Sequence, residues 1–274
     1  MSHLSRRSVV IRSIASVLVA GCVGVSSASA QTAPVGAYDE LLRLYVKPSA
    51  DGVNRVDYIA WKKNKADLAK LDATLKEMMS ATPSKLERNA AMAYWINLYN
   101  AVTLKVILDK YPVASIRDIK SDGFLDPKAY TGPWRTKRTK IEGTDYSLDD
   151  IENNALRPVF KDPRVHYAVN CASFGCPNLL NRAWTAATLD ADLDAAARDF
   201  VNHKRGVEIQ PGNKLKVSSI YSWFEGDFGT TGQDAVLAHF RKYGRPELIK
   251  ALDAGAKIGD NDYIWTLAVV KPGS

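Results

Sequence analysis

Residues 90–104 (AAMAYWINLYNAVTL) are apolar on nearly every face when placed on a helix. A helix that is apolar all round must be covered by other elements, so this segment predicts a buried central helix. Ser84 and Glu87 have the spacing of a capping box and predict where the helix opens. Pro112 cannot continue a helix, so the end is expected near Lys110.

The segments around this helix alternate between helical and strand patterns without a regular βαβ order. The sequence therefore predicts an α+β fold, a single domain with the buried helix packed on a small, mainly antiparallel sheet. Leucines and other apolar residues at helical spacing predict helices, and alternating residues around turn signals predict strands. The expected helices are 67–80, 147–157, 189–201, 231–243 and 246–252, and the expected strands are 164–170, 207–210, 214–217 and 263–269.

The first thirty residues have the composition of an export signal. They hold Arg6, Arg7 and Arg12 but no Asp, Glu or Lys, then an apolar stretch and small residues up to Ala30. This order predicts a signal peptide over 1–30 and an exported, periplasmic protein. Cleavage before Cys22, giving a lipid-anchored lipoprotein, is the alternative. The apolar stretch is too short to predict a transmembrane span.

The remainder is expected to hold a flexible lead-in at 31–37 and one globular domain at 38–272. A composition with 46% hydrophobic and 24% charged residues excludes collagen-like, low-complexity and wholly disordered chains. The net charge of +7 falls to +4 without the three arginines of the signal, which argues against a nucleic-acid partner.

Candidate catalytic groups gather between residues 145 and 177. A Cys171 thiolate would be a strong nucleophile, with His166 as its general base and Glu152 as an orienting group. On an extended strand, however, His166 and Cys171 point to opposite faces about 16 Å apart. They can meet only if the chain turns back at Asn170 or Cys171.

Structural roles are the alternative for the same residues. Cys171 and Cys176 are candidates for a disulfide, because exported proteins keep disulfides oxidised. Asn97 and Asn100 lie one turn apart on the apolar helix and, with Asn170, are candidate substrate-binding residues; pinning a neighbouring loop is their structural alternative. Without a glycine-rich phosphate loop or a set of metal ligands, no cofactor and no metal are expected.

Several motifs stand together in order along the chain. They are YWINLYNA at 94–101, SLDDIE at 147–152, DPRVH at 162–166, CASFGCP at 171–177 and the segment from Ser218 to Phe228. Jointly they resemble the domain-of-unknown-function 547 family over about residues 90–228. The resemblance implies no assigned activity, but it draws attention to Asn97, Asn100, Glu152, His166 and Cys171.

Two functions remain open from the sequence. The first is a cysteine-dependent hydrolase or acyl-transfer enzyme using Cys171, His166 and Glu152. The second is a non-catalytic envelope protein that binds a small molecule, a peptide or an envelope polymer, with a structural Cys171–Cys176 disulfide. Thiol–disulfide exchange is a weaker third option, because the C-x-x-C spacing of redox proteins is absent.

Overall fold

A computed structural model describes residues 35–120 and 132–270 of the chain. The expected signal peptide and Cys22 lie outside the described residues. The described part has an α+β fold in which helices predominate and the strands form three small sheets. The first helix already begins at Gly36, inside the segment expected as a lead-in. Up to residue 120 the elements are α1 (Gly36–Tyr45), β1 (Val46–Lys47), β2 (Arg55–Val56), α2 (Tyr58–Lys63), α3 (Lys65–Ser80), the 3-10 turn η1 (Pro83–Lys85), α4 (Arg88–Lys110) and the 3-10 turn η2 (Ile116–Asp118).

Shorter elements and a second group of helices follow. Those before residue 170 are β3 (Thr139–Ile141), β4 (Thr144–Tyr146), α5 (Leu148–Asp150), the π-helix η4 (Ile151–Leu156), α6 (Arg157–Phe160) and the 3-10 helix η5 (Pro163–Tyr167). The later ones are α7 (Leu189–Asn202), β5 (Val207–Gln210), β6 (Lys214–Ser218), α8 (Ile220–Trp223), α9 (Glu225–Phe228), α10 (Gln233–Tyr243), α11 (Pro246–Asp253) and β7 (Lys257–Asp262).

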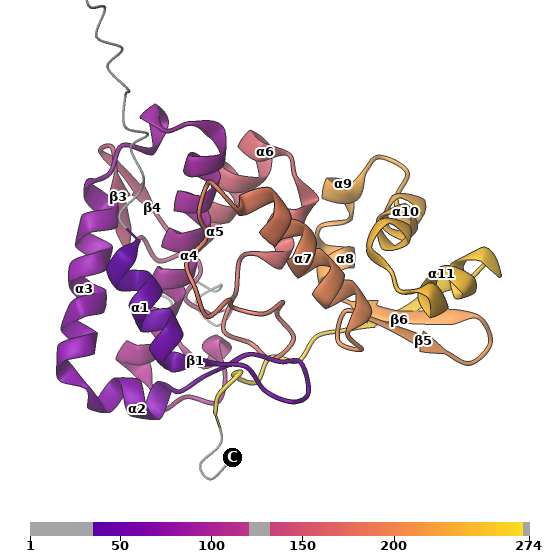
Figure 1. Ribbon diagram of the computed structural model, residues 1–274, viewed down its shortest axis with the longest axis horizontal. Coiled ribbons are helices and arrows are strands. Elements are labelled where there is room, and N and C mark those ends of the chain that lie inside the picture. The colour runs from indigo at the N-terminus through magenta and orange to yellow at the C-terminus, as the bar shows by residue number, and fades with distance from the viewer. Residues whose placement is uncertain (1–34, 121–131, 271–274) are drawn as a thin grey trace, which may run out of the picture. The chain divides into compact units, whose positions relative to one another are not determined.

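The apolar helix α4 is buried without interruption from Met92 to Leu104. Its neighbours are chiefly helical, namely α2, α3, α5 and η4 (Figure 1), so it is covered by helices more than by a sheet. It ends at Lys110, as predicted. The predicted capping box is wrong, because Glu142 from the β3–β4 turn bonds both the amide and the hydroxyl of Ser84. The helix therefore begins at Arg88 without a side-chain cap.

A second apolar cluster packs under α7, α10 and α11 against the hairpin β5–β6. The hairpin is antiparallel, as its Pro-Gly-Asn turn predicts, whereas β7 joins β6 in parallel. The prediction of a strand at 263–269 is wrong, because the last described strand, β7, ends at Asp262. Residues 266–269 instead make single bridges to three separate segments, at Ser115, Ser173 and Val56, so no ladder can grow there.

Two further predictions near residue 160 are also wrong. Pro158 lies in the first turn of α6, where its missing N–H costs little, so the helix continues to Phe160 and ends at Lys161 with a left-handed φ of 50°. Residues 163–167 form the 3-10 helix η5 rather than a strand. Pro163 opens that helix and the side chain of Asp162 caps the amide of Arg164.

Candidate active site

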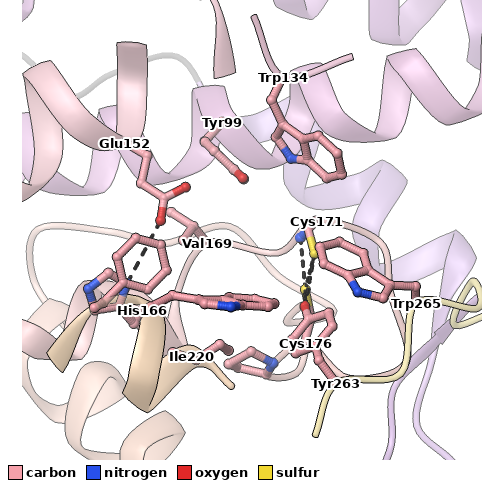
Figure 2. Close-up of a pocket in the computed structure, with 13 residues that line it drawn as sticks. Tyr99, Trp134, Glu152, His166, Val169, Cys171, Cys176, Ile220, Tyr263 and Trp265 are labelled. Carbon is pink, nitrogen blue, oxygen red and sulfur yellow. Dashed lines mark hydrogen bonds and ion pairs between the residues drawn. The ribbon is translucent and has the colours of Figure 1, made fainter. Parts of the chain in front are cut away.

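A cavity of about 160 Å³ lies where the two apolar clusters meet (Figure 2). Tyr99 from α4 and Val169 contribute to its wall from the first cluster, and Ile220 and Phe224 contribute from the second. The titratable groups at its wall come from α4, η4, η5, the loop after η5 and the chain after β7. They are Glu152, His166, Cys171, Cys176, Tyr99 and Tyr263.

Glu152 is positioned by a short π-helix. Ser147 caps α5 through the reciprocal Ser147–Asp150 box, and the chain then widens into η4, where the amide of Arg157 donates to the carbonyl of Glu152. Such wide turns are common at functional sites because they turn one side chain out of the regular helical register. The Glu152 side chain is 14% exposed. Burial raises its pKa, although His166 works in the opposite direction.

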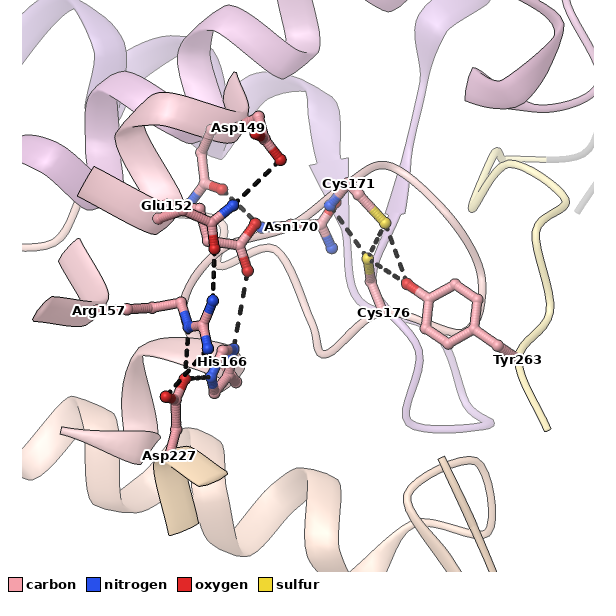
Figure 3. Close-up of polar contacts among 11 residues, drawn as sticks. Asp149, Glu152, Arg157, His166, Asn170, Cys171, Cys176, Asp227 and Tyr263 are labelled. Carbon is pink, nitrogen blue, oxygen red and sulfur yellow. Dashed lines mark hydrogen bonds and ion pairs between the residues drawn. The ribbon is translucent and has the colours of Figure 1, made fainter. Parts of the chain in front are cut away.

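His166 is held on both edges of its ring. Its Nε2 lies 2.7 Å from Oδ2 of Asp227, and its Nδ1 lies 3.8 Å from Oε1 of Glu152 (Figure 3). The ring stacks on Phe224 with centroids 4.2 Å apart. The residue is 2% exposed. These contacts fix the imidazole between two carboxyl groups.

Asp227 of α9 completes this network. Arg157 pairs with it through two hydrogen bonds of 2.5 and 3.0 Å. Burial alone would raise the pKa of Asp227, but the hydrogen bonds from His166 and Arg157 outweigh burial and hold that pKa below its usual range. Nothing in the local sequence predicts that Asp227 and Arg157 orient His166. The signal that points to Asp227 is the motif from Ser218 to Phe228, which contains it.

The two cysteines meet at the other side of the cavity as free thiols. Their sulfurs are 2.6 Å apart, and the Tyr263 hydroxyl lies 3.0 Å from Cys171 Sγ and 2.9 Å from Cys176 Sγ. The hydrogen bond from Cys176, aided by Ser173 and Tyr263, outweighs burial and lowers the pKa of Cys171 to about 6. Burial, followed by the hydrogen bond to Cys171, raises the pKa of Cys176.

The loop between the cysteines is folded back by specific backbone features. Ala172 has a φ of +67°, a left-handed conformation that reverses the chain after Cys171. Gly175 donates to the carbonyl of Ile264 at 2.8 Å, and a Cβ at Gly175 would lie 2.8 Å from the Ile264 nitrogen, so only glycine fits. Phe174 bonds Thr266 in the same way. The loop is therefore tied to the segment that carries Tyr263.

The predicted Cys171–His166 pair is not formed as a hydrogen bond. Both residues line the cavity, but the ring nitrogens of His166 face Asp227 and Glu152, and the Cys171 sulfur faces Cys176 and Tyr263 (Figure 3). Glu152 lines the cavity on the His166 side and the sulfurs line the other. The cavity thus has a carboxyl group on one side and the two sulfurs on the other (Figure 3).

The three candidate substrate-binding asparagines are occupied by backbone groups. Asn97 donates to the carbonyl of Trp184 at 2.8 Å and accepts from its amide at 3.0 Å. Asn100 bonds the carbonyl of Ala168 and the amide of Asn170. Asn170 in turn bonds the carbonyl of Pro177 and the amide of Ala172. These amides hold the loops that form the site, and none of the three residues lines the cavity.

Aromatic rings line the side of the cavity next to the cysteines. The ring centroids of Trp223, Tyr263 and Trp265 are 4.6 to 5.7 Å apart, and Trp134 meets Trp265 edge to face at 5.7 Å. Trp223 is 49% exposed. Sequence reasoning missed Trp134, Tyr263 and Trp265, because each comes from a segment with no local sign of a site.

Residues 35–120 and 132–270 contain no group of three or more His, Cys, Asp or Glu side chains placed to hold a metal ion. The helices within those ranges also include none that is both long and apolar enough to cross a membrane.

The protein is therefore an α+β domain whose cavity is lined by residues from a π-helix, a 3-10 helix and a loop that holds two cysteines. Residues 83–201 match the family described as "Protein of unknown function, DUF547", and the chain belongs to this family through that region. The match contains Glu152, His166, Cys171 and Cys176, whereas Asp227 and Tyr263 lie beyond it. No curated protein and no solved structure matches the chain.

Proposed function

We propose that the protein is an exported, cysteine-dependent enzyme that hydrolyses or transfers an acyl group, with Cys171 as the nucleophile. The observation that carries this proposal is the arrangement of a thiol of lowered pKa and a carboxyl of raised pKa around one cavity. A thiolate is an intrinsically strong nucleophile, and a protonated carboxyl can serve as a general acid; burial, which raises the pKa of Glu152, favours its protonated form.

The reaction would proceed in two steps. Cys171 Sγ attacks the substrate carbonyl carbon to form a C–S bond, the bond to the leaving group breaks, and the Glu152 carboxyl gives its proton to that group. Water, or a second acceptor, then attacks the thioester. Glu152 takes the proton of the attacking group, and the Cys171 thiolate leaves. The two steps together return the enzyme to its starting charge and protonation.

His166, Asp227 and Arg157 are assigned to positioning in this mechanism. Arg157 fixes Asp227, Asp227 fixes His166, and the Nδ1 side of His166 faces the Glu152 carboxyl. This differs from the sequence-based hypothesis, in which His166 takes the proton of Cys171 directly. The change follows from the 2.7 Å bond that occupies Nε2 of His166.

The test is to trap the thioester. We would incubate the reduced protein with nitrophenyl esters of small apolar and aromatic acids and look for an acyl group on Cys171 by mass spectrometry. Cys171→Ala should lower turnover by about 10²-fold or more, and Glu152→Gln should slow release of the acyl group by about 10²- to 10⁴-fold. Turnover that survives in Cys171→Ala would overturn the proposal.

The aromatic wall favours a second candidate, a non-catalytic envelope protein that binds a sugar polymer or a peptide. The exposed Trp223 offers a flat apolar face for a sugar ring or an aromatic side chain. In that case Trp223→Ala would weaken binding of oligosaccharides or peptides, measured by tryptophan fluorescence, while Cys171→Ala would bind normally. A thioester trapped on Cys171 would count against this candidate.

A further inference from the structure

Hydrogen bonds within the loop hold Cys171 and Cys176 in contact, although the two residues lack the C-x-x-C spacing. Asn170 ties both ends of the loop, through the amide of Ala172 and the carbonyl of Pro177. The amide of Cys171 donates to Cys176 Sγ at 3.0 Å, and the sulfurs lie 2.6 Å apart. No large movement of the backbone is needed for the two sulfurs to react with each other.

The two sulfurs differ in access and in protonation. Both cysteines line the cavity, but Cys171 is half-buried, whereas Cys176 is only 3% exposed. Hydrogen bonds from Cys176, Ser173 and Tyr263 favour the thiolate at Cys171, while burial keeps the proton on Cys176. An accessible thiolate next to a buried thiol is the asymmetry that thiol–disulfide exchange needs, because one sulfur attacks and the other resolves.

We propose that this pair carries out thiol–disulfide exchange with small disulfides that enter the cavity, Cys171 attacking and Cys176 resolving. This activity goes beyond the acyl chemistry proposed above and uses only the sulfur pair. Apolar and aromatic side chains line the cavity, including Trp134 and Trp265, so an uncharged or aromatic group attached to the attacked sulfur fits it best.

The exchange balances in two steps. Cys171 thiolate attacks one sulfur of the disulfide, the S–S bond breaks, and the first thiolate leaves and takes a proton from water. Cys176 then gives up its proton and attacks the Cys171 sulfur. The Cys171–Cys176 bond forms, and the second thiolate leaves with that proton. The substrate disulfide is reduced by two electrons and the cysteine pair is oxidised by two.

The experiment uses the reduced full chain with Cys22→Ser, so that only the pair can react, and the aromatic disulfide 5,5′-dithiobis(2-nitrobenzoate) as the probe. We expect about two equivalents of the coloured thiol from each chain and a protein that ends with an internal disulfide and no attached probe. Adding Cys176→Ser should give about one equivalent and a lasting mixed disulfide on Cys171. Adding Cys171→Ser should slow the reaction of the folded protein by about 10-fold or more.

A folded protein that keeps the probe on both cysteines, or whose Cys176 reacts without Cys171, would overturn the proposal. Near-ultraviolet circular dichroism of each variant establishes that it is folded. Failure here is separate from failure of the acyl-transfer proposal, because exchange is read from the final state of the sulfurs and acyl transfer from ester turnover. A protein that exchanges disulfides but cleaves no ester would retain this inference and lose the other.

Discussion

Asp227 Oδ2 and His166 Nε2 are joined by a 2.7 Å hydrogen bond across 61 residues of sequence. The bond links α9, next to the second apolar cluster, to η5, which borders the first. Asp227 also pairs with Arg157, so it holds both Arg157 and His166, and the His166 ring faces the Glu152 carboxyl. The position of the carboxyl group at the cavity thus depends on a contact that no local pattern contains.

Asp227→Asn should therefore lower stability and weaken the pH dependence of unfolding. The pKa of Asp227 is held below its usual range, so its stabilising contribution is present above about pH 4 and is lost as the pH falls through the folded-state value. At pH 7 we expect the free energy of unfolding to fall by about 1–2 kcal/mol, since both partners are a quarter exposed.

Urea unfolding between pH 3 and pH 7 would measure this effect. The wild type should lose stability more steeply than Asp227→Asn on acidification. Asp145→Asn is the matched control, because Asp145 is 57% exposed and 3.6 Å from Lys140. Parallel pH profiles for the wild type and Asp227→Asn would contradict the prediction.

Glu152→Gln should raise stability at high pH while lowering activity. Burial raises the pKa of Glu152 in the folded state, so its contribution to stability is full below its ordinary pKa and declines as the pH rises through the raised value. The neutral glutamine avoids that loss. The variant should be more stable than the wild type at pH 8 and nearly equal at pH 4, while its acyl-transfer rate falls.

Chemical unfolding at the two pH values checks the stability half of this prediction. Glu247→Gln serves as the control, since that side chain is 70% exposed and should show no pH-dependent difference. If Glu152→Gln is instead less stable than the wild type at pH 8, the ionised carboxylate is stabilising the fold, and burial is not the dominant influence on its pKa.

The parts of the fold that the sequence predicted are those with a local cause. The helix α4 follows from a run of apolar residues, and the β5–β6 hairpin follows from the turn at Pro211 and Gly212. The segment 164–170 was predicted wrongly because Val165, Tyr167 and Val169 alternate, yet a 3-10 helix also buries Val165 and Tyr167. Asp162 and Pro163, a cap and a helix-opening proline, were the local signals against a strand.

The candidate site was predicted only in part, for a similar reason. Glu152, His166, Cys171 and Cys176 stand close in sequence and do line one cavity. Their chemical partners do not stand close: Tyr263 is 92 residues after Cys171. Asn97 and Asn100 were predicted as substrate-binding residues, yet both bond the backbone of neighbouring loops. An asparagine in a buried helix looks the same in sequence whether its partner is a substrate or a loop.

Asn97→Ala should destabilise the protein without altering the cavity's titrating groups. It removes both hydrogen bonds to Trp184 and leaves a buried amide and a buried carbonyl without partners, which costs about 2–4 kcal/mol. Asn154→Ala, at an exposed position with one 3.2 Å contact, should change stability by less than about 0.5 kcal/mol. Thermal unfolding of both variants makes the comparison, and equal losses would contradict it.

Cys171 should be alkylated with a pH midpoint near 6, well below the value of about 8.5 for an unperturbed thiol. The hydrogen bond from Cys176 is the main cause, so Cys176→Ala should move the midpoint upward, and Tyr263→Phe should move it upward by less. Rates of reaction with iodoacetamide across pH 4 to 10, in reduced protein carrying Cys22→Ser, give these midpoints. A wild-type midpoint near 8.5, or one that Cys176→Ala leaves in place, would show that the neighbouring thiol does not stabilise the thiolate. A wild-type midpoint near 8.5 would also leave the nucleophile without activation by any group that surrounds it, and both proposals for this cavity would lose their physical basis.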